Sequence, residues 1–417
     1  MSATRALPST RKPPDHWLLA IVFTLLALGL MMVFSSSSVT AAGMRETNHD
    51  PYFFIKRQGM WACVALMAMW VAMRIDLEKF RKLSLPLVLL AVGMLVAVLV
   101  PGIGVVVNGA RRWIAVGGFT FQPSEFAKFA LMFYLADCLA RRGTKIQQGA
   151  RLVPLLAIFG LIVLLIEMEP DLGTALVVAA GFFAVLFMSG ARFSHLAGLV
   201  GMGIMGVIML IIKEPYRFDR MLVFLDPWKD PEKNGYHMVQ SLLALGSGGT
   251  WGLGLGESRQ KFFYLPEQHT DFIFAVLGEE LGLVGTLAVL SLFLLFLYKG
   301  FKLAVKSRDN YLGLLAGGIT FTIAFQAFLN IGVVSGAMPL TGIPLPLISY
   351  GGTSLVLTLS SVGLLVNVST RRRERREESE EISAPVSETE SLTRKFHDMG
   401  YGLVPVTRVR ERRRARR

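Results

Sequence analysis

The stretch between residues 246 and 280 holds the residue types best suited to chemistry in this chain. Glycines recur over residues 246–256, where they permit tight turns and close approach of the backbone to a ligand. The sequence then places Asp271, Glu279 and Glu280 in a strongly apolar run. A carboxylate inside an apolar span costs about 2.5–3.5 kcal/mol on insertion scales, so packing alone does not account for these acids. Among them, Asp271 is the first candidate for catalysis.

Asp271 follows His269 and Thr270 and stands immediately before Phe-Ile-Phe-Ala-Val, at the expected first turn of an apolar helix. An acid at this position caps a helix by accepting hydrogen bonds from free N–H groups. Alternatively, partial desolvation raises its pKa, which suits a general base. Spacing alone leaves both interpretations open. Glu279 and Glu280 lie deeper in the same run, and we expect them to be buried and paired.

Further ionisable residues flank other apolar segments. Glu125 and Lys128 are three positions apart, so they share one face of a helix. Asp171 follows a proline between two apolar segments. For these three residues, a structural ion-pair network and direct contact with substrate are both open. Arg111 and Arg112 lie in a glycine-rich loop, where they indicate either an anionic ligand or contact with lipid headgroups.

The composition of the chain indicates that these residues are positioned by the helices of a membrane protein. The chain has 417 residues, of which 53% are hydrophobic, and a mean hydropathy of +0.51, well above the usual soluble range. We expect an all-α polytopic fold of about ten transmembrane helices, with a large extracytoplasmic loop between helices 7 and 8. The expected spans are 17–36, 53–73, 85–104, 125–140, 152–168, 172–189, 194–213, 271–298, 311–334 and 346–368.

Basic residues orient these spans. Lys and Arg gather after the second, fourth, sixth and eighth spans, on the side of the N-terminus, as the positive-inside rule requires of the cytoplasmic side. This predicts a cytoplasmic N-terminal tail over 1–16, a transmembrane domain over 17–370 with its extracytoplasmic loop at 214–270, and a basic, disordered cytoplasmic tail over 371–417. Both termini are therefore expected in the cytoplasm and the candidate site outside. This topology also accounts for the net charge of +13, so nucleic acid is not an expected partner.

Several familiar chemistries are not expected. The six histidines are scattered, without the ligand spacing of a structural metal site. Cys63 and Cys138 lie in apolar segments, so the chain has no disulfide framework. The sequence contains neither a Gly-x-Ser-x-Gly nucleophile motif nor a phosphate-binding P-loop.

Over residues 10–370 the chain resembles the SEDS (shape, elongation, division, sporulation) proteins, and within that family it looks most like the division-specific FtsW branch. The segments that carry the resemblance are GARRW (109–113), QPSEFAKFA (122–130), EPDLGTA (169–175), FLDPWKDP (224–231), QSLLALGSGG (240–249), QKFFYLPEQHTDFIFAVLGEELG (260–282) and PLPLISYGGTS (344–354). The segment MPLTGIPLP at 338–346 is instead closer to the elongation and sporulation branches.

The resemblance implies an inverting peptidoglycan glycosyltransferase. Such an enzyme polymerises lipid II into β-1,4 glycan strands at the outer face of the cytoplasmic (inner) membrane, here in septal cell-wall synthesis during cell division. It further implies that the acid matching Asp271 is catalytic. The implied residues for binding the lipid-pyrophosphate substrate or lining its cavity are Arg57, Arg111, Arg112, Glu125, Lys128, Asp171, Lys261 and His269.

The implied mechanism is a single displacement. Asp271 takes the proton from the acceptor sugar hydroxyl, which attacks the anomeric carbon of the growing chain's lipid-pyrophosphate, and one inversion needs only one base. Cationic side chains stabilise the departing pyrophosphate. No cofactor is certain, and a divalent cation, Mg²⁺ or Mn²⁺, is left open. The implied partners are lipid II, undecaprenyl-pyrophosphate-linked glycan, a cognate class B penicillin-binding transpeptidase, other division proteins and membrane lipid.

Three alternatives are left open. A lipid II flippase or transporter would also need polar groups between helices, although it should place them near the middle of the membrane. A scaffold that recruits the transpeptidase would tolerate changes at Asp271. Finally, the same polymerase would suit elongation or sporulation as well as division.

Overall fold

The computed structural model describes residues 13–383, apart from residues 108, 118, 144–146, 234, 262–264 and 308. Residues 13–370 form one compact unit. The predicted tails fall largely outside the described residues, which exclude 1–12 and 384–417. The backbone over 371–383, which was expected to be disordered, instead continues the last helix.

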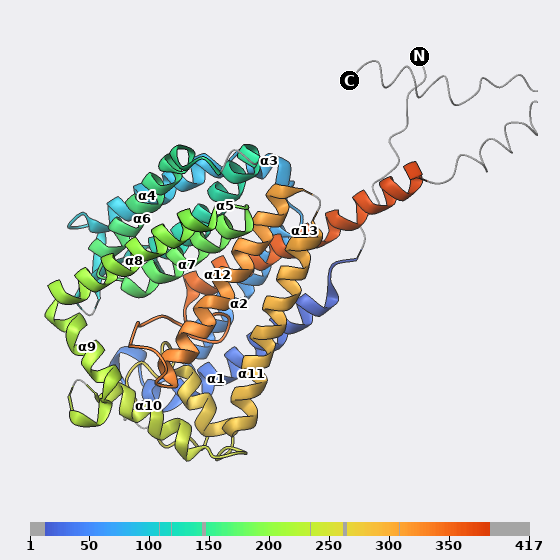
Figure 1. The fold of residues 1–417 in the computed structure, drawn as a ribbon. Coiled ribbons are helices and arrows are strands. Elements are labelled where there is room, and N and C mark those ends of the chain that lie inside the picture. The colour runs from blue at the N-terminus through green and yellow to red at the C-terminus, as the bar shows by residue number, and fades with distance from the viewer. Residues whose placement is uncertain are drawn as a thin grey trace, which may run out of the picture. The chain divides into compact units, whose positions relative to one another are not determined.

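Among the described residues, ten long helices correspond to the ten expected spans (Figure 1). They are α1 (His16–Gly43), α2 (Phe53–Ala72), α4 (Ser84–Leu99), α5 (Pro123–Arg142), α6 (Val153–Met168), α7 (Leu172–Met188), α8 (Phe193–Lys213), α11 (Ile273–Lys306), α12 (Asn310–Val334) and α13 (Gly352–Ser383). By length and composition, α1, α8, α11, α12 and the part of α13 up to Thr370 are long and apolar enough to cross a membrane. The predicted all-α class is confirmed.

The helix starts follow from local sequence. The carboxylate of Asp15 accepts hydrogen bonds from the first backbone N–H groups of α1, and Asp309 does the same for α12. Pro123 occupies the first turn of α5, where its missing N–H costs nothing. Arg141 and Arg142 lie in the last turn of the same helix, where positive charge complements the helix dipole.

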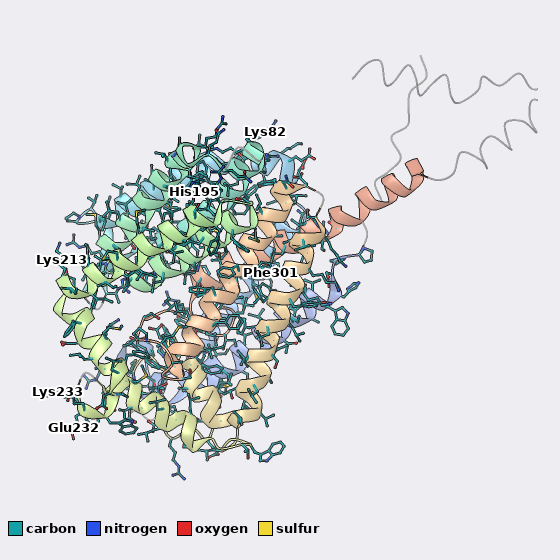
Figure 2. All side chains as sticks on the ribbon, viewed as in Figure 1. Lys82, His195, Lys213, Glu232, Lys233 and Phe301 are labelled. Carbon is teal, nitrogen blue, oxygen red and sulfur yellow. The ribbon has the colours of Figure 1, made fainter. Side chains whose placement is uncertain are left out.

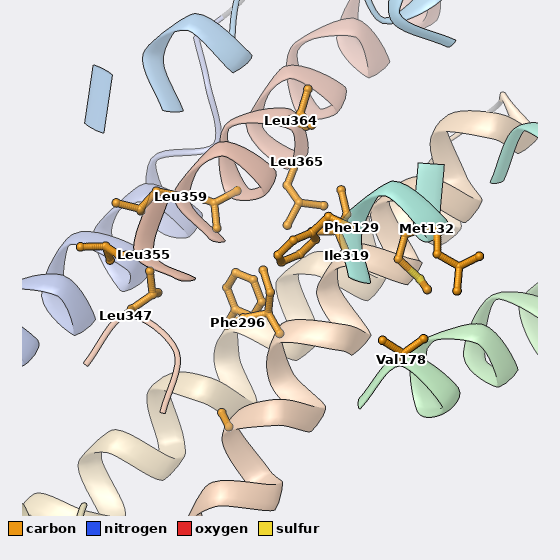
Figure 3. Packing of buried hydrophobic residues seen from close by; sticks show 14 of the residues in the cluster. Phe129, Met132, Val178, Phe296, Ile319, Leu347, Leu355, Leu359, Leu364 and Leu365 are labelled. Atoms are coloured by element: carbon orange, nitrogen blue, oxygen red, sulfur yellow. The ribbon is translucent and has the colours of Figure 1, made fainter. Parts of the chain in front are cut away.

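The core forms where α5, α7, α11 and α12 pack together. Phe129 and Met132 of α5, Val178 of α7, Phe296 of α11 and Ile319 of α12 are all buried in one cluster (Figure 3). In a membrane, such close van der Waals packing replaces the hydrophobic effect as the force between helices. The core therefore holds the four helices that surround the polar residues described below.

A small antiparallel sheet separates α4 from α5, and it was not predicted. Its order is β1-β2-β3, formed by β1 (Gly104–Val107), β2 (Ala110–Val116) and β3 (Phe119–Phe121). The span expected over 85–104 ends at Leu99, since Pro101 forces the preceding residue into an extended conformation.

The expected loop at 214–270 lies between α8 and α11 and contains helical structure of its own. It holds α9 (Pro215–Leu225) and α10 (Tyr236–Ser247). One further short helix, α3 (Leu77–Arg81), follows α2. Figure 2 shows Lys233 and Glu232, between α9 and α10, far from Lys82, which lies near α3. The 214–270 segment therefore lies toward the opposite end of the helix bundle from α3.

Two predicted span starts are also corrected. The last span begins at Gly352 rather than at 346, because Leu347 has a φ of 67°, which lies outside the right-handed helical region. The span expected from 271 begins at Ile273, so Asp271 precedes the helix.

The helix α11 breaks at Gly282, where φ is 66° and ψ is −164°. The glycine-rich loop packs into this break. Leu253 N donates to Glu279 O (3.0 Å) and Leu283 N donates to Gly249 O (2.9 Å), so the loop satisfies backbone groups that the break would leave unpaired. A Cβ at Gly252 would lie 2.1 Å from Glu280 O, so this close approach requires glycine.

Candidate active site

A cavity of about 630 Å³ is enclosed by parts of α2, the sheet, α5, the α6–α7 turn, α9, the segment before α11 and the α12–α13 connection. Its aromatic wall includes Trp61, Trp113 and Tyr350. The ionisable residues in its wall are Arg57, Arg112, Glu125, Asp171, Arg217, Arg220, Glu267 and Asp271. Five of the nine predicted site residues are among them, and Arg111, Lys128, Lys261 and His269 are not.

Asp271 lies in this wall on the turn that precedes α11. It does not cap that helix, because the N-cap residue is Phe272 and no side chain caps the helix end. The carboxylate faces Gly342, whose missing Cβ would lie 3.5 Å from Asp271 Oδ2. Among the residues that the structure describes, none donates a hydrogen bond to this carboxylate. The capping interpretation of Asp271 is therefore wrong.

The electrostatic environment of Asp271 favours its neutral form. Burial, followed by the negative charges of Glu267 and Asp171, raises the pKa of Asp271 from 3.8 to about 7. Arg112 and Arg220 act in the opposite direction. A carboxyl group with this pKa is half ionised near neutral pH, as a general base requires.

Asp171 lines the cavity from the start of α7, where it serves as the N-cap. Its Oδ1 accepts a hydrogen bond from Thr174 N (3.0 Å) and its Oδ2 accepts one from Thr174 Oγ1 (2.9 Å). Gln122 Nε2 also approaches Oδ2 at 3.4 Å. The capping geometry therefore fixes where this carboxylate points.

Arg112 joins the sheet to the α6–α7 turn. Its guanidinium donates from Nε to Glu169 O (2.9 Å) and from Nη2 to Pro170 O. Glu169 itself is fully buried, and burial together with the charge of Asp171 raises its pKa to about 9. Arg112 and Trp113 line the cavity and Arg111 does not. The register between β1 and β2 shifts at this point, because Val105 pairs with Trp113 and Val106 with Arg111, so Arg112 is the extra residue of a β-bulge, a feature that re-aims a side chain.

Glu125 and Lys128 form a buried pair one turn apart on α5. Lys128 Nζ donates to Glu125 Oε1 (2.9 Å) and to Gln326 Oε1 on α12 (2.5 Å), and Lys128 is 1% exposed. Glu125 reaches the cavity wall, whereas Lys128 lies behind it. Of the two interpretations of this group, an ion-pair network describes Lys128 best, while Glu125 and Asp171 line the cavity as well.

Lys261 and His269 lie near the cavity without lining it. Lys261 is buried, donates from Nζ to Gly256 O and lies 3.6 Å from the buried carboxylate of Glu280. His269 packs against the rings of Phe54 and Tyr350, with ring centroids 4.6 and 5.6 Å away. Burial lowers the pKa of His269 below its ordinary value, so its imidazole is neutral near pH 7.

Glu279 and Glu280 are buried and paired, as expected from their depth in the apolar run. Glu279 accepts hydrogen bonds from Ser258 Oγ (2.5 Å) and from the backbone N–H of Arg259 (3.0 Å). Glu280 accepts one from Ser35 Oγ of α1 (2.5 Å). These carboxylates hold the loop before Asp271 against α11 and α1.

Sequence reasoning missed two arginines as cavity residues. Arg217 and Arg220 belong to α9, and Arg217 Nη1 lies 2.8 Å from Glu167 Oε2 at the end of α6. Their three-residue spacing on a short amphipathic helix was the available signal. Within the described part of the chain, no group of three or more His, Cys, Asp or Glu side chains is placed to hold a metal ion.

Comparison with known proteins identifies the relatives of the chain. The family of FtsW, RodA and SpoVE cell cycle proteins matches residues 16–374. The chain is 42% identical over 360 residues to the probable peptidoglycan glycosyltransferase FtsW of Geobacter sp. (strain M18), covering 86% of this chain and 97% of that protein. It is 44% identical over 368 residues to the stage V sporulation protein E of Bacillus subtilis (strain 168), covering 88% of this chain and all of that protein (100%).

Two solved structures from the same kind of protein are similar to this chain in fold. A chain from a peptidoglycan synthase complex, studied for how polymerization and crosslinking are coordinated, superposes with a TM-score of 0.71 at 32% identity, covering 86% of this chain and 98% of that one. The rod shape determining protein RodA of Thermus thermophilus superposes with a TM-score of 0.64 at 30% identity, covering 86% and 97%.

Proposed function

Because the chain belongs to the FtsW, RodA and SpoVE family of cell cycle proteins, we propose that it is a peptidoglycan glycosyltransferase that polymerises lipid II into β-1,4 glycan strands during septal wall synthesis. It is a multi-pass membrane protein. One observation supports the assignment of the proposed reaction to a particular residue. The carboxylate of Asp271 lies in the wall of the cavity, caps no helix, and has a pKa raised to about 7.

In the proposed reaction, ionised Asp271 accepts the proton of the acceptor sugar hydroxyl as that oxygen attacks the anomeric carbon of the growing chain. The bond from this carbon to the lipid-pyrophosphate breaks, and the configuration inverts. Proton transfer to a positioned base contributes about 10²–10⁴-fold in rate. Burial of Asp271 suits the role, because a base with a pKa near the working pH combines an adequate ionised fraction with good basicity.

The departing pyrophosphate requires positive charge. Arg57 and Arg112 line the same cavity as Asp271, and α9 adds Arg217 and Arg220. We assign pyrophosphate stabilisation to these arginines, because Lys128 directs its ammonium group to Glu125 and Gln326 instead. Planar guanidinium groups also match phosphate oxygens better than a lysine does.

A divalent cation bound in the cavity would be compatible with the proposed reaction. Mg²⁺ is commonly held by one or two carboxylates together with substrate phosphates, and Asp171 keeps an acceptor position on Oδ1 beside its capping bond. Asp171 and the substrate's own phosphate oxygens therefore fit Mg²⁺ or Mn²⁺. Such a cation would neutralise charge on the pyrophosphate.

The cellular arrangement follows the charge distribution. Positive-inside topology supports a cytoplasmic membrane protein with both termini in the cytoplasm and the cavity on the outer side. A structural relative comes from a complex that couples polymerization to crosslinking. We therefore assign this chain a cognate class B transpeptidase as its partner, which would cross-link the glycan as it forms.

A lipid II transporter is the second candidate. The observation that favours it is the buried Glu125–Lys128 pair, since charges inside a helix bundle often mark transport pathways. However, Lys128 is already bonded to Glu125 and Gln326 and does not line the cavity. The enzyme is the stronger candidate, because its acid does face the cavity.

Polymerisation of purified lipid II, by the detergent-solubilised protein with its transpeptidase, tests the proposal. Wild-type protein should form glycan, and Asp271→Asn should be at least about a hundredfold slower while remaining folded. Equal glycan from both proteins would refute the assignment of the base. No glycan from either, together with lipid II translocation in proteoliposomes, would favour the transporter.

A further inference from the structure

Three successive backbone carbonyls in the segment that carries Asp271 accept hydrogen bonds from α12 and the α12–α13 connection. These bonds run from Tyr350 N to His269 O (2.9 Å), from Ser349 Oγ to Thr270 O (2.6 Å) and from Asn330 Nδ2 to Asp271 O (2.7 Å). A turn before a helix does not ordinarily have every carbonyl paired with distant residues. Here the backbone of 269–271 is held at each residue.

Asn330 has the central place among these contacts. It lies on α12, is 2% exposed, and its Nδ2 also donates to Ile343 O at 2.7 Å. The two N–H bonds of one amide therefore tie Asp271 to the α12–α13 connection. The bond to Ile343 O is buried and the bond to Asp271 O is partly buried, so loss of the amide would leave two carbonyl groups without this donor.

The α12–α13 connection is itself fixed to neighbouring helices. Gln326 Nε2 donates to Pro344 O (3.0 Å), and Gln326 in turn accepts the hydrogen bond from Lys128 of α5. Gln58 of α2 bonds to Ser349 O and to Gly351 N, each at 3.3 Å. The support on which Asn330 places Asp271 is therefore braced from two other helices.

We propose that Asn330 is a positioning residue for catalysis, which holds the carboxylate of Asp271 at its place in the cavity by fixing the backbone of 269–271. The inference rests on the proposed function of Asp271 as the base. It follows from a difference in hydrogen bonding between the carboxylate of Asp271 and its backbone carbonyl. Described residues supply no hydrogen bond to its carboxylate, whereas its carbonyl oxygen accepts one from Asn330. The position of the reacting oxygen is thus determined through the backbone.

A buried asparagine elsewhere in the fold provides a matched control. Asn367 of α13 is 3% exposed, and its Nδ2 likewise donates to two backbone carbonyls, Ala72 O (3.0 Å) and Ile75 O (2.7 Å). These acceptors lie at the end of α2, about 27 Å along the helix from Phe54, which packs against His269. Asn367 has the same chemistry as Asn330 but no connection to Asp271.

The experiment measures kcat, KM and the pH profile of lipid II polymerisation for Asn330→Leu and Asn367→Leu in the complex with the transpeptidase. Leu has the same branched arrangement of four side-chain heavy atoms as Asn and cannot donate. Because displacement of a catalytic group by about 1 Å can cost about a hundredfold, Asn330→Leu should lower kcat by about that factor, with KM changed less than about threefold. Its pH profile should move to lower pH, since a released Asp271 is better solvated. Asn367→Leu should keep kcat within about threefold and leave the profile in place.

A milder variant keeps the test valid if Asn330→Leu does not fold. Ser349→Ala removes only the bond to Thr270 O and the acceptor for Leu345 N. It should lower kcat by about tenfold with the same direction of pH shift, because one of three carbonyl bonds is lost. Both variants and the control should have comparable thermal stability for the comparison.

Each outcome decides a different question. Normal kcat and an unmoved pH profile in Asn330→Leu and Ser349→Ala, with Asp271→Asn inactive, would overturn the role of Asn330 and leave the proposed function standing. Equal losses in Asn330→Leu and Asn367→Leu would also overturn it, since the effect would then be one of general stability. Full activity of Asp271→Asn would refute the base itself, and the inference with it.

Discussion

Burial of Asp271, together with the charges of Glu267 and Asp171, raises the pKa of this carboxyl group to about 7. A general base acts in its ionised form, so polymerisation should accelerate as pH rises. A group with a pKa of about 7 is about 9% ionised at pH 6 and about 91% ionised at pH 8, which gives an increase of about tenfold. The assay is kcat/KM for lipid II across this range, because that parameter reports ionisation in the free enzyme.

Changing a single charge sharpens this test. Glu267 lines the cavity, and its carboxylate is one of the charges that raise the pKa of Asp271. Glu267→Gln keeps the acceptor that Thr270 Oγ1 contacts at 2.9 Å but removes the charge, so the rising limb should move to lower pH. Glu232→Gln, in the segment between α9 and α10, should leave the limb unchanged. A kcat/KM that is flat between pH 6 and pH 8, or a shift to higher pH in Glu267→Gln, would refute the reasoning.

Two further predictions concern stability. The pKa of Asp271 is about 7 in the folded protein, against an ordinary value of 3.8. Ionisation of Asp271 should therefore lower the free energy of unfolding as pH rises from about 4 to about 7, by at most about 4 kcal/mol. Asp271→Asn cannot ionise, so its apparent Tm should exceed that of wild type by a margin that grows between pH 4 and pH 7. A lower Tm than wild type at pH 7 would contradict this prediction. Gly252→Ala should cost about 3 kcal/mol in thermal unfolding, because its Cβ would lie 2.1 Å from Glu280 O at a φ of 81°. Gly256→Ala is the matched control, because Gly256 has a similar φ of 83° but no atom within 4 Å of an added Cβ. It should cost only the roughly 1–2 kcal/mol of the left-handed conformation, and a loss equal to that of Gly252→Ala would contradict the explanation by close approach.

Hydropathy was sufficient to locate the ten long helices, since a stretch of apolar residues has few alternatives in a membrane. It was insufficient for the sheet. Short apolar runs such as 104–107 do not distinguish a strand from the end of a helix. The dipeptide Asn108–Gly109 between two β-branched runs was the available signal, because it favours a tight hairpin turn.

The candidate site was only partly accessible from sequence. Asp271 stood out because an acid before an apolar run is costly, and charge spacing paired Glu125 with Lys128. Which of these residues lines the cavity depended on the direction of each side chain, and no sequence pattern gives this. Asn330 was missed because a single amide in an apolar helix resembles ordinary packing. Gln326, one turn earlier on the same face, was the signal that a polar row runs along α12.

The break in α11 at Gly282 has a consequence for how the protein is made. Residues 283–297 are apolar and expose Leu283, Val284 and Leu287, so the translocation machinery can release this part into lipid as a span. The part before the break carries two carboxylates and is disfavoured as a span, so it must fold against neighbouring helices afterwards. The carbonyls of Thr270 and Asp271, just before α11, are bound by Ser349 and Asn330, which are synthesised 79 and 59 residues later. At about 5–20 residues per second, the nascent chain spends several seconds before these donors to residues 270–271 have been synthesised. We therefore expect the segment that carries Asp271 to be among the last parts of the protein to form.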